Sequence, residues 1–466
     1  MNAALNNNKI DQVLMMKTGR VLLAAPLIFS MFSPSAYAEP LDGRGEGDLS
    51  RFLFGNALQQ YGIDADVLLD MGYGRNNRST HEERKYGNSN APIPGQDDEG
   101  FELQSLHLFV DKRLKSDILP RVTPLPGPVP QDFDFGFSLG TMYGRNAQFP
   151  RTFGWDAHWK VNEPGASDIE SSIRHRQNYL VVQNLFATAY LPYGTGITLW
   201  AGIFGPAIGY EIGPNLRDAR NNFSTRSYAF ISEPNTLSGV MAGTRLYSGD
   251  AGMLGVELGL VRGWNNLRDN NDTPSVNGAL RWRTADMQTW IDYEFIVGDE
   301  QNKSFGDVQA PTSLVVSPRG QLKQQHSING WHAFNSQWSM GAEAVYGRQD
   351  GDGRPDTVDV VTGPGFSGAE WWGVNANVTY QYHKDLSFSG RIEHFDDKQG
   401  FILYPLSSAR GAINAVTTGL RYDVTRNVSL RPEIRYDWQS GSSDKAFGSG
   451  RNQSQLTGVV EALIYF

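Results

Sequence analysis

The sequence of 466 residues contains no cysteine and no long hydrophobic run. The lack of cysteine excludes disulfide scaffolds, thiol catalysis and thiolate metal sites. A helix that spans a bilayer needs about 20 consecutive apolar residues, so the chain is not a helical membrane protein of the ordinary kind. Basic residues are in the minority, since 41 Lys and Arg stand against 50 Asp and Glu. The resulting net charge of −9 argues against nucleic acid as a partner.

Glycine and aromatic residues, in contrast, are abundant, with 51 Gly and an aromatic fraction of 12%. Glycine is unfavourable inside helices, whereas aromatic side chains fit the pleated surface of a sheet. The composition therefore favours many short strands. The composition is also compatible with a transmembrane β-barrel, because alternate residues of each barrel strand are polar.

The N-terminal region has the three parts of a secretory signal peptide. Lys17 and Arg20 give a positive start, an apolar stretch of 12 residues follows, and Ala36-Tyr37-Ala38 is a small-x-small cleavage site. The apolar stretch is too short to span a bilayer, which favours cleavage over anchoring. An exported, cysteine-free and acidic protein indicates a Gram-negative periplasm or outer membrane.

After Tyr61 hydrophobicity follows a period of two, the pattern of a strand with one apolar and one polar face. Residues 63–73 show it first, with Asp64, Asp66 and Asp70 on the polar face. Strands of about 10 residues with this alternation, in an even number, are typical of outer-membrane barrels. Sixteen segments have the pattern: 60–74, 101–115, 133–144, 178–191, 196–205, 237–248, 253–264, 275–285, 287–298, 324–334, 338–347, 370–383, 386–396, 411–425, 428–439 and 453–466.

Long and short connections alternate between these segments, with 116–132 as the exception. We therefore predict an all-β fold, a transmembrane antiparallel β-barrel of about 16 strands with long extracellular loops and short periplasmic turns. The chain divides into a signal peptide over 1–38 (with Met15 and Met16 as alternative true starts), a short periplasmic segment over 39–59 and the barrel over 60–466.

Aromatic residues fall near the predicted strand ends, as in the girdles of membrane barrels. Trp338 and Tyr346 lie in one strand and Trp372 and Tyr382 in another. The last predicted strand is apolar on one face and ends at Ile464 and Phe466. We interpret this ending as the signal for the barrel assembly machinery.

The stretch 192–242 resembles the OmpL-like β-barrel porin family (porin-2). The matching positions are Gly194, Gly196, Ala201, Gly202, Phe204, Pro206, Gly209, Glu211, Asn222, Arg226, Ser227 and Tyr228. Thr225 departs from the serine of the family pattern. The resemblance implies a passive outer-membrane pore and implies no particular solute.

Alternation places a set of charged residues on the polar face of the strands, toward the lumen. Such charges need water or partners, and a barrel of 16 strands encloses an aqueous channel. We expect most of them to brace the wall in pairs and a few to select solutes. The set is Asp64, Asp66, Asp70, Asp134, Glu257, Arg281, Arg283, Asp292, Glu294, Glu343, Arg391, Glu393, Arg421, Asp423, Arg431, Glu433, Arg435 and Asp437.

The connection 206–236 is the best candidate for selectivity, because it is long enough to fold inward and narrow the lumen. Three acids and three arginines in one loop can set a transverse field. The alternative is an ordinary surface loop with solvated charges. The candidates are Glu211, Arg217, Asp218, Arg220, Arg226 and Glu233.

Metal and catalytic motifs are weak. Asp350, Asp352 and Asp356 are acidic residues separated by glycine that can hold Ca²⁺, but their spacing does not fit an EF-hand, and a solvated loop is the alternative. The Gly136-Phe-Ser138-Leu-Gly140 match to a serine-hydrolase elbow lies inside an alternating strand. We therefore expect that the protein binds no cofactor and has no enzymatic activity.

The first functional hypothesis is an outer-membrane porin through which small hydrophilic solutes or ions diffuse passively. The expected surroundings are outer-membrane lipid and lipopolysaccharide, with a homotrimer as one candidate assembly. A non-conducting barrel that acts as an adhesin, receptor or structural protein is the alternative, and a barrel hydrolase is a third.

Overall fold

The computed structural model describes residues 48–78, 100–114, 129–161, 178–206, 208–211, 221–268, 273–300, 322–351, 367–403, 410–441, 445–448 and 451–466. The predicted signal peptide therefore lies outside the described residues. Within the described ranges, no helix is both long and apolar enough to cross a membrane.

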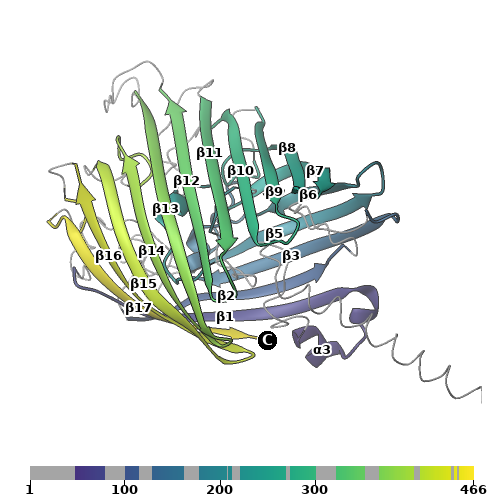
Figure 1. Ribbon diagram of the computed structural model, residues 1–466, viewed down its shortest axis with the longest axis horizontal. Coiled ribbons are helices and arrows are strands. Elements are labelled where there is room, and N and C mark those ends of the chain that lie inside the picture. Colours follow the sequence, from purple (N-terminus) through teal and green to yellow (C-terminus); the bar gives the residue numbers. More distant parts are fainter. Residues whose placement is uncertain are drawn as a thin grey trace, which may run out of the picture.

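One antiparallel sheet contains most of the described residues (Figure 1). Its long strands are β1 Ile63–Asn76, β2 Gly100–Lys112, β3 Asp134–Gly144, β5 Asn178–Leu191, β6 Ile197–Phe204, β7 Leu237–Gly249, β8 Gly252–Val261, β9 Ser275–Arg283, β10 Thr289–Asp299, β11 Leu322–Ala333, β12 Trp338–Asp350, β13 Gly368–His383, β14 Leu386–Asp397, β15 Gly411–Thr425, β16 Val428–Ser440 and β17 Ser454–Tyr465.

The sheet closes on itself. Each long strand pairs with the next along the sequence, and β17 pairs with β1 in a register that places Leu68 opposite Tyr465. The predicted 16-strand antiparallel barrel is thereby confirmed, and each predicted strand lies within three residues of an observed one at both ends. One further strand, the two-residue β4 (Lys160–Val161), pairs with β5 inside the connection after β3.

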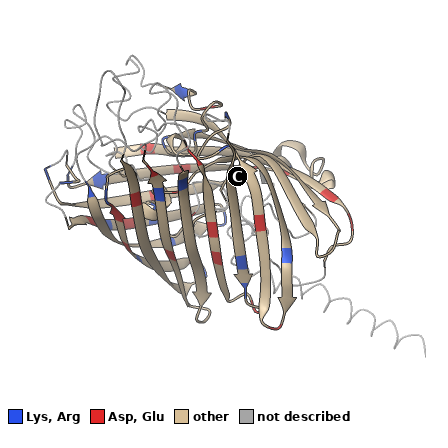
Figure 2. Ribbon diagram, turned by 90° about the horizontal axis from the view of Figure 1, so that it is seen from above, with Lys and Arg blue, Asp and Glu red and all other residues tan. Residues whose placement is uncertain are grey.

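The two faces of the strands differ in chemistry, as the alternation predicts. Val240, Leu258 and Ile434 are more than half exposed on the outer face. Glu257 and Arg435, on the opposite face, are buried inside the barrel. Figure 2 shows the acidic and basic positions interspersed along neighbouring strands. A polar interior and an apolar exterior are the arrangement that lipid requires of a barrel.

Short helices complete the fold, and the sequence pattern did not indicate them. The helix α3 (Asp48–Phe54) and the 3-10 turn η1 (Gln59–Tyr61) precede β1, and the 3-10 turn η3 (Asn146–Gln148) follows β3. The helix α5 (Tyr228–Ile231) lies in the connection between β6 and β7, with Ser227 as its N-cap. These helices have three to seven residues, which is too few to establish a helical period.

The largest apolar cluster lies inside the barrel around α5. Tyr228 and Ala229 of α5 pack with Trp371 of β13 and with the segment 401–403 that follows β14. The interior of the barrel next to β12–β15 therefore has a small hydrophobic core of its own.

Candidate functional site

The connection between β6 and β7 lies against the inner wall of the barrel. We call its described part, residues 208–211 and 221–233, the lumen segment. Nearly all of its side chains are buried. Its hydrogen bonds run to β2, β10–β14 and β16, so the segment contacts a wide arc of the wall.

The segment first meets the wall at β10 and β12. The amide of Gly209 donates to Glu294 Oε2 at 2.6 Å, and the amide of Tyr210 donates to Glu343 Oε1 at 2.9 Å. The Tyr210 ring stacks on Trp290 with 5.8 Å between centroids. Two wall carboxylates therefore hold two successive peptide groups.

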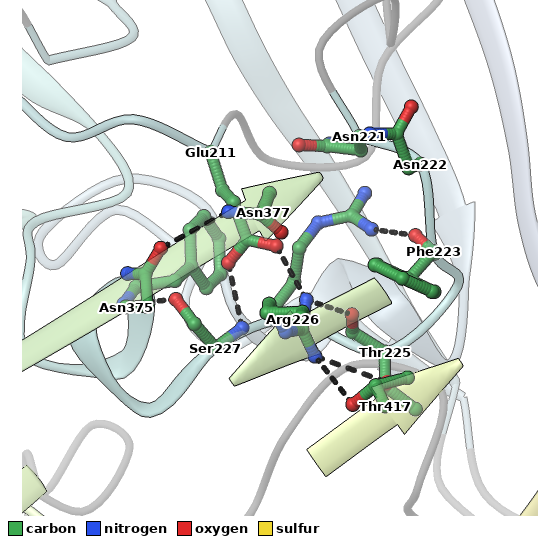
Figure 3. A network of polar contacts seen from close by, with 12 residues as sticks. Glu211, Asn221, Asn222, Phe223, Thr225, Arg226, Ser227, Asn375, Asn377 and Thr417 are labelled. Carbon is green, nitrogen blue, oxygen red and sulfur yellow. Dashed lines mark hydrogen bonds and ion pairs between the residues drawn. The ribbon is translucent and has the colours of Figure 1, made fainter. Parts of the chain in front are cut away.

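Arg391 of β14 joins the two halves of the lumen segment. Its Nη1 lies 2.7 Å from Glu211 Oε1 and also donates to the carbonyl of Thr225 at 2.9 Å. The other oxygen of Glu211 accepts from the amide of Ser227 at 2.6 Å, a contact visible in Figure 3. A guanidinium with this many fixed acceptors positions both halves of the segment.

Residues of β16 bind the next part of the segment. Glu433 accepts from the amide of Ser224 at 2.7 Å and from the amide of Thr225 at 3.3 Å. Arg431 Nη1 donates to the carbonyl of Asn221 at 2.8 Å. This strand therefore binds the peptide groups of the segment through one acid and one base.

The helix α5 is held in the same way. The amide of Tyr228 donates to Glu393 Oε2 and its hydroxyl donates to Asp437 Oδ1, both at 2.8 Å. Arg435 binds Glu393 and Asp437, each at 2.8 Å, and donates to the carbonyl of Arg226 at 2.9 Å. The ion pairs of the wall and the contacts to the segment form one network.

These hydrogen bonds share one pattern. Wall carboxylates accept from backbone amides of the segment, and wall arginines donate to its backbone carbonyls. Four acids (Glu294, Glu343, Glu393 and Glu433) and three arginines (Arg391, Arg431 and Arg435) follow it. The wall thus fixes the path of the segment mainly through peptide groups. Buried polar groups of this kind are costly unless paired, so the path is strongly specified.

A second charged cluster lies on β8–β10. Arg281 binds Glu257 at 2.9 Å, Asp292 at 2.6 Å and Glu294 at 2.7 Å. Arg283 also pairs with Asp292. Because these acids and bases lie on adjacent strands, the cluster braces the wall.

The exposure of the predicted wall residues differs from the expectation of direct contact with water. Most of them are buried. Arg391, Arg431 and Arg435 are bound to the lumen segment, whereas Glu257, Arg281 and Asp292 are bound to one another in the cluster on β8–β10. Asp66 is buried and Asp64 half-buried at the start of β1. Arg421 and Asp423 form a half-buried pair at 3.1 Å near the end of β15.

Half of the predicted selectivity residues can be placed. Glu211, Arg226 and Glu233 are buried, whereas Arg217, Asp218 and Arg220 lie outside the described residues. Arg226 Nη1 donates to the carbonyl of Phe223 at 2.8 Å (Figure 3) and to the carbonyl of Ser224 at 3.0 Å. Burial raises the pKa of Glu233 well above its ordinary value, and the hydrogen-bonded carboxylate of Glu343 raises it further.

The remaining predicted sites are at the ends of strands. Asp350 pairs with Arg348 at 2.8 Å, while Asp352 and Asp356 lie outside the described residues. Within the described part of the protein, no three acidic or histidine side chains are placed to hold a metal ion. Ile464 and Phe466 lie on the outer face at the end of β17, where Phe466 is half exposed.

Sequence reasoning did not identify Gly209, Thr225 and Tyr228 as contact residues. The backbone of Gly209 has φ of +100°, and a Cβ there would overlap the carboxylate of Glu233. All three positions lie within the stretch that resembles the porin family, so that motif was the available signal. The sequence could not show which wall residues they meet, because those residues lie 85 to 209 positions further along.

The closed barrel, its apolar outer surface and the lumen segment bound to a charged wall define an outer-membrane channel of the porin class. Residues 62–466 match the family described as beta-barrel porin-2, OmpL-like, and the chain belongs to this family. Its place is accordingly the bacterial outer membrane. No curated protein matches the sequence.

Among solved structures, the chain is similar to the outer membrane channel DcaP of Acinetobacter baumannii, with 11% identity and a TM-score of 0.48 over 87% of this protein and 98% of that one. It is similar to OprB of Pseudomonas putida, with 10% identity and a TM-score of 0.47 over 89% and 97%. It is also similar to an anion-selective porin from Comamonas acidovorans, with 8% identity and a TM-score of 0.46 over 87% and 99%.

Proposed function

We propose that the channel admits small hydrophilic solutes or ions by passive diffusion, and that the lumen segment decides which of them pass. The observation that supports this proposal is the binding of the segment to seven charged wall residues through its backbone. Barrels of 16 strands are wide enough for an aqueous channel, so a segment fixed inside the wall narrows that channel.

In this proposal, the charges of the segment and of the wall that face the channel determine which solutes and ions pass. Rings and rows of fixed charges near a constriction are the usual basis of ion selectivity in pores. The predicted candidates Glu211, Arg217, Asp218, Arg220, Arg226 and Glu233 belong to the connection that forms the segment. Because Arg391 pairs with Glu211, the field at the constriction depends on the wall as well as on the loop.

We further propose that the protein is not an enzyme. The hydrolase-like Gly136-Phe-Ser138-Leu-Gly140 lies within the regular strand β3, without the strand-turn-helix context that such a nucleophile needs. His394 lies on the outer face of β14 beside Trp372, with 4.9 Å between ring centroids. A position against lipid does not suit a histidine that must exchange protons with a polar substrate.

The surroundings of the barrel are also proposals. Outward aromatic residues at the strand ends support contact with outer-membrane lipid and lipopolysaccharide, and Ile464 with Phe466 supports recognition by the barrel assembly machinery. A homotrimer is the assembly that we propose to test, by native mass determination of the protein in detergent.

Liposome swelling tests the function. Vesicles that contain the protein should swell in isotonic solutions of small sugars, at rates that fall with increasing solute size, while protein-free vesicles should not. A salt gradient across a planar bilayer then gives the sign of ion selectivity from the reversal potential. Swelling no faster than in protein-free vesicles, with the barrel folded, would favour the non-conducting alternative of an adhesin, receptor or structural protein.

A further inference from the structure

The helix α3 lies against the outside of the barrel. Alternation along β1 places Ala65 on the outer face together with Val67 and Leu69, which are partly exposed. Ala65 is only 6% exposed, and Ser50 of α3 is fully buried. Figure 1 shows α3 beside the first residues of β1. We therefore infer that α3 covers the side chain of Ala65.

This is also the place where the closing seam of the barrel ends, the seam being the pairing of β1 with β17. The amide of Phe466 donates to the carbonyl of Val67 at 2.9 Å, and the amide of Val67 donates to the carbonyl of Phe466 at 3.1 Å. Residues 63–66 of β1 extend beyond these last bonds of the seam. Strand edges that extend beyond their partner are usually covered, and α3 lies where a cover is needed.

The side chains of residues 51–54 of α3 are all exposed, and all but Arg51 are large and apolar. Phe52 is 85% exposed, and Leu53 and Phe54 are each more than half exposed. Tyr61, in η1, is exposed as well. Three consecutive large apolar side chains on a helix of seven residues would be unfavourable in water.

We propose that α3 is an interfacial helix, whose Phe52, Leu53 and Phe54 side chains insert into the lipid leaflet at the turn end of the barrel and thereby cover the end of the seam. The turn end is the end at which the short connections lie. The proposal rests on the membership of the porin family and goes beyond it, since a porin needs no such helix.

Continuity with the lipid-facing surface favours lipid as the occupant. The helix packs on the outer row of β1, and aromatic side chains on the same outer surface near the turn end, Tyr382, Tyr422 and Phe466, are also exposed. An apolar helix face beside such a belt is the usual form of an interfacial anchor. A second copy of the protein is a poorer fit, because a stable interface buries about 800 Å² per partner and a helix of seven residues offers far less.

The absence of cysteine makes the test direct, since one introduced cysteine takes one nitroxide label. Phe52→Cys is labelled and reconstituted into vesicles of phosphatidylethanolamine and phosphatidylglycerol. Val460→Cys, on the outer face of β17, is the lipid-exposed reference, and Lys384→Cys, in the turn after β13, is the aqueous reference. The collision rates of each label with oxygen and with a water-soluble nickel chelate are then measured by electron paramagnetic resonance.

The label at position 52 should collide with oxygen as often as the label at 460 and at least five-fold less often with the chelate than the label at 384. Chelate access equal to that at 384 would overturn the proposal, as would dipolar broadening that shows labels of two copies in contact. Phe54→Cys repeats the test if the first variant does not fold, with heat-modifiable gel mobility as the check. A lipid-exposed label at 460 shows that the barrel itself is inserted, so failure of this proposal is distinct from failure of the channel assignment.

Discussion

Arg391 and Glu211 form a buried ion pair at 2.7 Å between a strand of the wall and the lumen segment, although 180 residues separate them in the sequence. Arg391 also binds Thr225, and Glu211 also binds Ser227, so the pair connects the two described parts of the segment. The position of the segment therefore depends on a few charged wall residues, and several measurements can test that dependence.

Replacing Arg391 should destabilise the barrel interior. In Arg391→Gln, Glu211 keeps, within the described part of the protein, the amide of Ser227 alone, and an uncompensated buried charge typically costs about 3–5 kcal/mol. Urea unfolding of the protein in lipid vesicles measures this cost. Arg348→Gln is the matched control, because the Arg348–Asp350 pair is solvent-exposed and should contribute less than about 1 kcal/mol. Equal losses in both variants would contradict the structural role of Arg391.

Gly209 is required by the close approach of Glu233. In Gly209→Ala the new Cβ meets that carboxylate, and the positive φ of the backbone adds strain. We expect a loss of about 1–3 kcal/mol and a displaced segment, measured as a lower urea midpoint together with a changed channel conductance. Gly458→Ala, at a position with no heavy atom within 4 Å of the added Cβ, should change neither.

The hydroxyl of Tyr228 contributes to the docking of α5. Tyr228→Phe removes the hydrogen bond to Asp437, which keeps Arg435 and Gln455 as partners. Loss of one hydrogen bond to a charged group should cost about 1–2 kcal/mol in urea unfolding. Tyr436→Phe, on the outer face, should stay within about 0.5 kcal/mol of the wild type. A larger effect for Tyr436→Phe than for Tyr228→Phe would contradict the assignment.

Asp156 should make stability depend on pH. It accepts from the amides of Thr152 and Val182, both at 2.7 Å, and burial raises its pKa from 3.8 to about 6. Because the folded state binds the proton more tightly than the unfolded state, the contribution of Asp156 to stability is largest below pH 4, falls as the pH rises to about 6 and is constant above it.

The Asp156→Asn variant lacks this titration. The difference in unfolding free energy between wild type and variant should therefore shift by up to about 3 kcal/mol between pH 4 and pH 6.5, the wild type losing stability relative to the variant. A difference that does not change with pH would show that the Asp156 carboxyl titrates normally in the folded protein.

The strands were predictable because each carries its own signal, the alternation of apolar and polar side chains. The helix α5 was not, since its four residues, Tyr228–Ile231, are held by Glu393 and Asp437 and by the apolar cluster around Trp371. Tertiary contacts of this kind leave no local pattern.

The face on which the interior charges lie was predictable, because the alternation of side chains along a strand assigns Arg391, Glu393 and Arg435 to one face. Pairing along the wall was predictable too, and Arg391–Glu393 and Arg435–Asp437 are such pairs. The partners on the lumen segment were not predictable. Arg391 and Arg435 bind carbonyl groups of Thr225 and Arg226, and backbone groups are present at every residue whatever the sequence. The sequence therefore indicated a water-facing wall where the structure has a wall covered by the lumen segment.

Single-channel recording of the wild type and Arg391→Gln in planar bilayers measures whether the lumen segment controls the pore. The wild type should show stepwise conductance, and the variant should show a changed conductance and reversal potential, because the released segment alters the width and charge of the constriction. Persistent silence of the folded wild type, or identical conductance and reversal potential in both proteins, would contradict this role of the segment.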